Sequence, residues 1–191
     1  MTLLIEMPQT KKFSANSLVE KLYRTEGKAE IINGEIVKFM STGEQPGTAA
    51  ANILVSLKLF QRKTKFGIAF GDNVGFLVNL PNRKSFSPDA SFFTGERTGM
   101  KFLQGAPIFA VEVRSENDYG KKADEAIKQK RHDYFIAGTK VVWDVDLLSE
   151  NIIKSYTSEN PNTPQIFKRG EIANAESALP NWIFEVDELF E

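Results

Sequence analysis

The sequence predicts one α/β (α+β) domain in which helices flank a central mixed β-sheet, with a helix and a β-hairpin at its N-terminal end. Three observations predict this class. The 191 residues suit one domain, and 41% hydrophobic with 26% charged residues is a globular composition. Segments with helical periodicity alternate with strand-like ones. An apolar strand, a helix and a second apolar strand follow one another, which predicts a right-handed crossover between parallel strands.

The individual elements follow from turn residues and hydrophobic spacing. The Asn33-Gly34 pair between two Ile-rich stretches is the preferred two-residue turn of a hairpin. Ser14 or Asn16 can cap a first helix that Gly27 ends. Residues 81–88 are expected to form a turn, and residues 152–191 two short strands and a docked terminal segment. The expected elements are helices over 14–26, 48–65 and 120–137, a hairpin over 28–40, and strands over 67–70, 75–80, 89–93, 107–114 and 139–146.

The composition excludes several classes of site. Without Cys there is no disulfide, thiolate zinc site or Cys nucleophile, and a single His gives little support to a hydrolase triad. A net charge of -1 argues weakly against a dedicated nucleic-acid scaffold and leaves a metal-dependent nuclease open. No apolar run long enough for a membrane helix occurs. Residues 1–12 are expected to be a flexible N-terminus without signal-peptide layout, and 13–191 one cytoplasmic domain.

Three residues stand out against their surroundings. Glu112 lies in the middle of the apolar strand "PIFAVEVRS" on the same face as Arg114, so it needs an ion-pair partner or a metal. Asp89 begins the strand "SPDASFF", where an ordinary turn aspartate is the simpler interpretation. Lys130 lies in the apolar stripe of the helix over 120–137, where a lysine is paired, functional or reaching for solvent.

Together these residue types suggest metal-assisted phosphodiester hydrolysis. Two carboxylates from neighbouring strands can hold Mg²⁺ or Mn²⁺, and the metal would activate a water and neutralise phosphate charge. A nearby lysine can position that water or stabilise the transition state. The competing hypothesis is a non-catalytic binding domain of the same fold, in which Arg114 pairs with Glu112 and no metal binds. Metal titration discriminates between the two.

The motifs "SPDASFF", "FAVEVRSENDYG" and "KRHDYFIAGTKVVWDVD", with the hairpin "AEIINGEIV", resemble the Uma-two family of restriction endonucleases. The resemblance covers about residues 28–146. The family belongs to the PD-(D/E)XK nuclease superfamily, so the resemblance implies a restriction-endonuclease-like fold and Mg²⁺-dependent cleavage of DNA. Pro88-Asp89 matches the PD element, and Glu112 matches the (D/E) position.

The chain departs from the superfamily pattern at one position. Arg114, the fourth candidate catalytic residue beside Asp89, Glu112 and Lys130, stands where a lysine is expected, and arginine cannot act as a base. The resemblance implies that Lys130 supplies the lysine from the helix instead. Glu30 and Glu35 match acids of the family's hairpin. Either acid could reach the metal, and both could equally be solvated.

The most basic stretch of the chain belongs to the helix over 120–137. It is expected to be a solvated helix face, and its weaker functional interpretation is contact with the DNA phosphate backbone. Its candidate residues are Lys121, Lys122, Lys128 and Arg131. Arg83 and Lys84 near a turn suggest a second DNA contact. His132 is expected to face solvent. A homodimer would place two sites on opposite strands of a duplex, but the composition does not show one.

Overall fold

The computed structural model describes residues 15–191, and a six-stranded sheet forms its centre. The sheet has the strand order β11-β10-β9-β8-β6-β3. Strands β8 and β9 are parallel, as the predicted crossover requires, and the other neighbours are antiparallel. The strands of this sheet are β3 (Ile68–Gly71), β6 (Ala90–Phe93), β8 (Phe109–Val113), β9 (Val141–Val145), β10 (Ile153–Thr157) and β11 (Gln165–Phe167).

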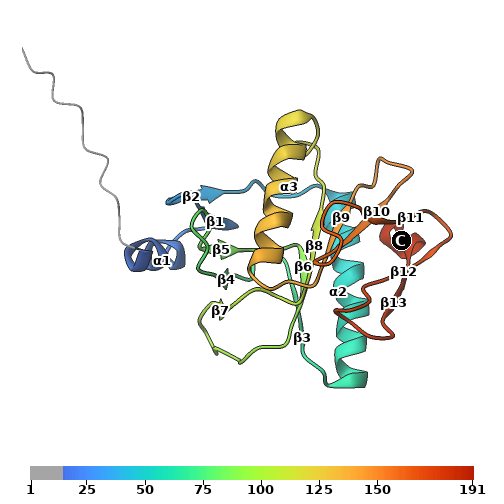
Figure 1. Cartoon of the computed structure of the whole chain (residues 1–191), viewed down its shortest axis with the longest axis horizontal. Helices are drawn as coiled ribbons and strands as arrows, with labels where there is room; N and C mark the ends of the chain where they lie inside the picture. Colours follow the sequence, from blue (N-terminus) through green and yellow to red (C-terminus); the bar gives the residue numbers. More distant parts are fainter. Residues whose placement is uncertain (1–14) are drawn as a thin grey trace, which may run out of the picture.

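Three small sheets and a few helices complete the described part of the chain. The two longest helices lie on opposite sides of the central sheet (Figure 1). The helices are α1 (Ala15–Tyr23), α2 (Glu44–Thr64), α3 (Lys121–Ile136) and the 3-10 helix η1 (Val186–Phe190). The remaining strands are β1 (Ala29–Ile32), β2 (Glu35–Lys38), β4 (Phe76–Leu77), β5 (Ser85–Phe86), β7 (Leu103–Gln104), β12 (Ile172–Asn174) and β13 (Ile183–Glu185).

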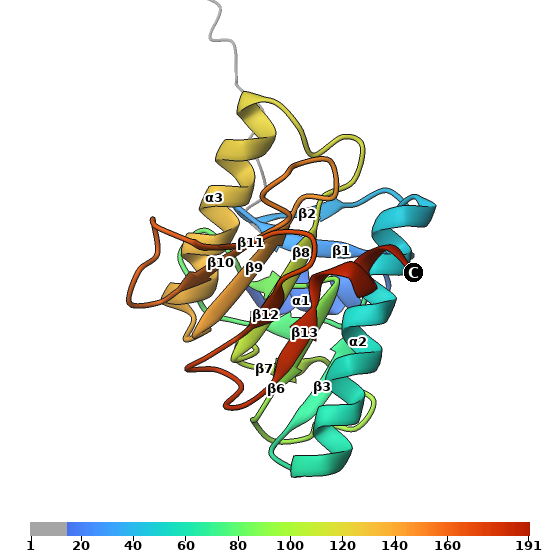
Figure 2. The ribbon, with the colours of Figure 1, turned by 90° about the vertical axis from the view of Figure 1, so that its right-hand side faces the viewer.

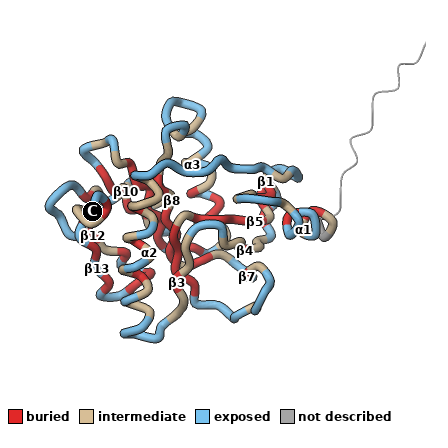
Figure 3. Tube along the Cα trace, turned by 180° about the vertical axis from the view of Figure 1, so that it is seen from behind, coloured by how far each residue is buried: buried red, intermediate tan, exposed pale blue. Residues whose placement is uncertain are grey.

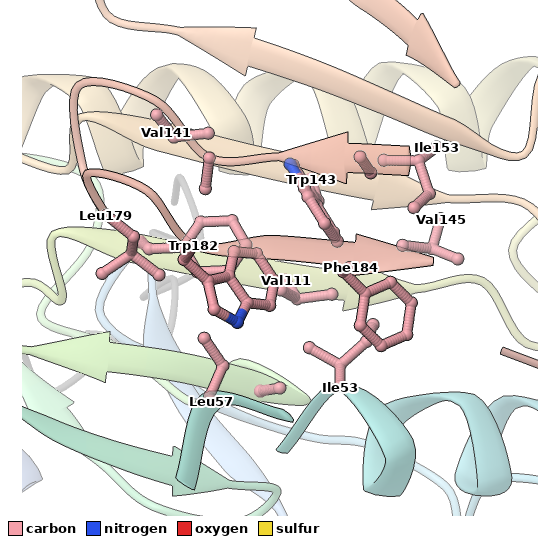
Figure 4. Close-up of a cluster of buried hydrophobic side chains, with 14 of the residues drawn as sticks. Ile53, Leu57, Val111, Val141, Trp143, Val145, Ile153, Leu179, Trp182 and Phe184 are labelled. Atoms are coloured by element: carbon pink, nitrogen blue, oxygen red, sulfur yellow. The ribbon is translucent and has the colours of Figure 1, made fainter. Parts of the chain in front are cut away.

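Alternation along the central strands separates two hydrophobic cores. Phe109, Val111 and Val113 point to the side of α2, where the larger core also receives Trp143 from β9. The C-terminal segment closes this side, because β12, β13 and η1 lie beside α2 over the sheet (Figure 2). Figure 4 shows Trp182 in this core near Trp143, Val111 and Leu179.

The opposite face of the sheet packs against α3 and the small sheet β5-β4-β7. Ala110 and Val142 contribute to this second core, together with Tyr134 from α3. Buried residues run along β8 and its neighbours, while the outer surfaces of the helices are exposed (Figure 3). Glu112 follows Ala110 on this face by alternation. The acid singled out in the sequence therefore points toward α3, between the sheet and the helix.

Most predicted elements are confirmed, and the differences have local causes. The hairpin turns at Asn33 and Gly34, whose φ values of 50° and 80° suit the predicted two-residue turn. Helix α2 begins at Glu44, four residues earlier than predicted. Pro46 does not prevent this, because it lies in the first turn, where backbone N–H groups have no acceptor within the helix. The flexible N-terminus predicted over 1–12 lies outside the described residues, as does the predicted cap Ser14. The alternative cap, Asn16, lies at the edge of the described range.

The segment after β4 and the C-terminal region differ most from the prediction. Residues 81–88 contain the short strand β5 rather than only a turn, and Arg83 within them is buried. Residues 152–191 form four short strands instead of two, followed by η1. No helix within residues 15–191 has the length and apolar character needed to cross a bilayer.

Candidate active site

The strand register brings Asp89 and Glu112 together. Ala90 pairs with Val111 across β6 and β8; Asp89 directly precedes Ala90 and Glu112 directly follows Val111, so the two acids lie at the same end of this strand pair. The Asp89 N–H donates to the Val111 carbonyl at 3.0 Å, which continues the pairing to this position. Cross-strand partners have Cβ atoms roughly 5 Å apart. The two acids identified in the sequence therefore share one site on the α3 side of the sheet.

Lys130 reaches this site from α3. Its Nζ lies 2.8 Å from the Glu112 carboxylate, and Tyr134, one turn further along, donates its hydroxyl to Glu112 Oε1 at 2.7 Å. Both side chains lie on one face of the helix because they are four residues apart. The predicted meeting of the helix lysine with the strand acid is found.

Glu30 of the hairpin is the second partner of Lys130. Its Oε1 accepts a hydrogen bond from the Ser87 N–H at 3.0 Å and lies 2.9 Å from Lys130 Nζ. Its Oε2 pairs with Arg83. Glu30 is fully buried, so the interpretation as a solvated acid is wrong for it. Glu35 is exposed on β2, and among the described contacts it has none with the site.

The pKa shifts follow from this arrangement. Burial, the largest effect, and the neighbouring Asp89 raise the pKa of Glu112 although Lys130 opposes the shift. Burial would also raise the pKa of Glu30, but Lys130 and Arg83 outweigh it and lower the pKa. Burial alone would lower the pKa of Lys130, and the two glutamates raise it instead. Lys130 is therefore an ammonium group in the folded protein at neutral pH.

A buried network behind Glu30 holds the hairpin against α3. Arg83 Nε donates to Asp133 at 2.9 Å, and Asn82 and Gln129 also donate to the Asp133 carboxylate. Arg83 is only 4% exposed, which argues against the predicted contact with DNA. The role of this segment is to fix Glu30, and through it Lys130.

Lys28, at the start of the hairpin, contacts the other acid. Its Nζ lies 2.5 Å from Asp89 Oδ1 and 2.7 Å from Asp72 Oδ1, while Asp89 Oδ2 accepts the Val113 N–H at 2.7 Å. Burial would lower the pKa of Lys28, but Asp89 and Glu112 raise it above the usual value, so this lysine is also charged. The sequence did not single out Lys28. The only local signal for it is its position two residues before Glu30.

Arg114 is separate from the acid pair. Its guanidinium donates twice to Asp144 on β9, at 2.8 and 2.9 Å, and contacts Asp124 on α3 at 2.7 Å. The Asp144 hydrogen bonds raise its pKa. The Glu112–Arg114 ion pair on which the non-catalytic hypothesis depended is therefore not formed, because Glu112 already pairs with Lys130.

The basic residues of α3 divide into two groups. Lys121, Lys122 and Lys128 are exposed, as a backbone contact would require. Arg131 is buried with its guanidinium 3.6 Å from the centre of the Tyr156 ring, which argues against the predicted contact with DNA. His132 is exposed as expected.

A cavity of about 790 Å³ opens beside the site. Asp89, Lys28, Asp72 and Val113 line it, together with residues of the segments 39–42 and 115–118. The ring of Phe39, also in the wall, lies 5.6 Å from Lys130 Nζ. A solute in this cavity can therefore reach Asp89 directly.

Glu30→Gln tests the buried network through pH. Because the pKa of Glu30 is lowered in the folded state, its ionised form stabilises the fold above the unfolded pKa of about 4.5, and that contribution is lost as pH falls through the folded pKa. At pH 7 the substitution should cost about 3–5 kcal/mol, because Arg83 and Lys130 lose a buried partner. Urea unfolding at pH 7 and below pH 4.5 measures both effects. The difference between wild type and variant should shrink at the lower pH, and a cost that is equal at both pH values would contradict this assignment.

Both the fold and the sequence resemble known proteins. A crystal structure described as "a putative nuclease belonging to DUF820" from Anabaena variabilis ATCC 29413 has the same fold, with a TM-score of 0.70 at 15% identity. The alignment covers 90% of this chain and 96% of that one. No curated protein matches the sequence. The likeness confirms the restriction-endonuclease-like fold. The profile of the Uma2 family, described as "Putative restriction endonuclease", matches residues 17–187, and the chain therefore belongs to the Uma2 family.

Proposed function

We propose that the protein is a Mg²⁺- or Mn²⁺-dependent endodeoxyribonuclease in which Asp89 and Glu112 hold the metal and Lys130 assists the attacking water. The family and the neighbouring structure support a nuclease function. The observation that carries the finer assignment is the meeting of these three side chains. Asp89 and Glu112 adjoin the paired residues Ala90 and Val111 at one end of the β6–β8 pair, and Lys130 is 2.8 Å from Glu112.

The chemistry of the donor set fits a small divalent cation. Within residues 15–191 no three or more His, Asp or Glu side chains gather closely enough to form a complete metal cage. Mg²⁺ does not need one, because it is usually held by one or two carboxylates and keeps several waters. Each carboxylate oxygen of Asp89 and Glu112 already has a protein partner but carries a second lone pair. When bound, the metal would lower the pKa of a water and offset phosphate charge.

The protein's own groups give Lys130 a defined role. Its ammonium is held between Glu112 and Glu30, and both acids raise its pKa. A lysine that stays protonated cannot remove a proton from water. It can donate hydrogen bonds to the water or to the phosphate oxygens as negative charge develops on them. Tyr134 keeps the Glu112 carboxylate turned toward this position.

The cavity beside Asp89 supplies a route for the DNA backbone. Lys121 and Lys122 begin α3 shortly after the segment 115–118 that lines the cavity, and both are exposed. We assign to them, and to Lys128, the phosphate contacts that position DNA without reading its sequence. Two copies of the chain would be needed to place one site on each strand of a duplex.

Conversion of supercoiled plasmid to nicked and linear forms tests the proposal. Wild-type protein should cut with Mg²⁺ or Mn²⁺ and stop when EDTA is added. Asp89→Asn should remove both cleavage and saturable Mn²⁺ binding, because one of the two ligand carboxylates is lost. Asp187→Asn is the matched control, since this aspartate is half-exposed in η1 on the far side of the core. Cleavage that persists in EDTA, or in Asp89→Asn, would overturn the assignment.

A further inference from the structure

The Asp89 carboxylate already carries a cation supplied by the protein. Lys28 Nζ lies 2.5 Å from Asp89 Oδ1, and only 16% of the Lys28 side chain is exposed. The other Asp89 oxygen is engaged by the Val113 N–H. The ammonium of Lys28 thus occupies Oδ1, the Asp89 oxygen that no backbone N–H engages. A divalent cation bound at Asp89 would be only a few ångströms from this positive charge, where repulsion is strong.

The two lysines of the site differ in their alternative partners. Lys130 lies between Glu112, whose side chain is 19% exposed, and Glu30, which is fully buried. Lys28 lies between Asp89 and Asp72, and the Asp72 side chain is 50% exposed at the cavity edge. Lys28 can thus withdraw from Asp89 and keep a partly exposed counter-ion in Asp72, whereas Lys130 would have to break its ion pair with the fully buried Glu30. Giving up a carboxylate should therefore cost less for Lys28 than for Lys130.

We propose that Lys28 occupies the cation position of the metal site until a divalent metal binds, and that it is then retained by Asp72 alone. This inference rests on the proposed metal site at Asp89 and Glu112. It assigns two residues outside the ligand pair to the control of metal affinity. Lys28 weakens binding by competing for Asp89, and Asp72 strengthens binding by accepting the displaced ammonium.

Titration calorimetry with Mn²⁺ as the only added ligand tests the competition. Lys28→Met should bind Mn²⁺ about tenfold or more tightly than wild type with unchanged stoichiometry, because the competing charge is gone. Lys38→Met is the matched control, since Lys38 is an exposed lysine on the partner strand of the same hairpin and should leave the affinity unchanged. Lys28→Gln repeats the test with a polar side chain, and thermal unfolding of each variant identifies any that fails to fold.

Asp72→Asn completes a double-mutant cycle. In wild-type background it should weaken Mn²⁺ binding several-fold, because Lys28 then has Asp89 as its sole partner. In the Lys28→Met background it should have no effect, since Asp72 acts through Lys28. If Lys28 and Asp72 acted independently, their effects on Mn²⁺ affinity would add. An effect of Asp72→Asn that disappears in the Lys28→Met background therefore shows that Asp72 acts by holding the displaced Lys28.

The outcomes separate this inference from the proposed function. Saturable Mn²⁺ binding that disappears in Asp89→Asn but is equal or weaker in Lys28→Met would overturn the competition and leave the metal site in place. Absence of saturable binding in wild type and in both Lys28 variants would overturn the metal site and the competition together. Tighter Mn²⁺ binding in both Lys28 variants, with unchanged binding in Lys38→Met, supports the metal site and the competition.

Discussion

Replacing Lys130 with methionine is expected to reduce DNA cleavage about 10²–10⁴-fold at saturating Mn²⁺. The ammonium is the one cation held 2.8 Å from Glu112 and 2.9 Å from Glu30, so no other described lysine can take its place at that point. The same change removes the ammonium that Glu112 shares with the fully buried Glu30 and should cost about 3–5 kcal/mol of stability. Single-turnover rates of plasmid cleavage measure the loss of activity, and the midpoint of urea unfolding measures the loss of stability.

Lys128→Met is the control for this experiment. Lys128 is exposed on the same helix and loses the same charge, so its effect on cleavage should be small and dependent on salt. Lys130→Arg keeps a charge for the acids but changes the donor geometry, and it should restore stability more fully than activity. If Lys130→Met cleaved DNA at the wild-type rate while folded, the lysine would have no part in the reaction.

Replacing Glu112 with glutamine is expected to abolish saturable Mn²⁺ binding and to lower cleavage on the order of 10³-fold, since a ligand carboxylate is removed. The fold should tolerate this change well. Burial and Asp89 raise the pKa of Glu112, so the ionised carboxylate is disfavoured in the folded state. The neutral amide has nearly the same shape and keeps an acceptor for the Tyr134 hydroxyl. Loss of function without loss of stability is the expected signature of this acid.

The pH dependence provides the second readout for Glu112. A carboxyl whose folded pKa is raised contributes stability below its unfolded pKa of about 4.5, and loses that contribution as pH rises toward the folded pKa. Wild type should therefore lose stability relative to Glu112→Gln between pH 4.5 and neutrality, which is opposite to the expected behaviour of Glu30→Gln. Urea unfolding across this range measures it. A variant that became less stable than wild type as pH rises would show that the carboxylate stabilises the fold.

The fold was largely predictable because local patterns determine its main elements. The apolar stretch ending at Val113, the helix from Lys121 and the apolar strand at Trp143 each have a clear period, and their order imposes a parallel pair. The small strands were not predictable. β4, β5 and β7 have two residues each and gain their pairing only from neighbours distant in sequence. A window of the sequence contains no signal for such contacts.

The site was predictable where a polar residue interrupts an apolar pattern. Glu112 and Lys130 were found in this way, and Asp89 through the motif around it. Glu30 was left undecided because a hairpin strand usually has one solvated face. Here the Ile32–Arg83 bridge lays residues 81–88 against that face and buries the acid. Lys28 and its exchange partner could not be found, since both are polar residues beside turns whose proximity depends on the assembled fold.

Crystals of the wild-type protein grown with Mn²⁺ test most directly whether Asp89 and Glu112 hold a catalytic metal beside Lys130, through the anomalous scattering of the ion. We expect a peak between the two carboxylates, with metal–oxygen distances of about 2.1 Å. Ordered Asp89 and Glu112 with no peak between them at saturating Mn²⁺, or a peak held only by other residues, would contradict it.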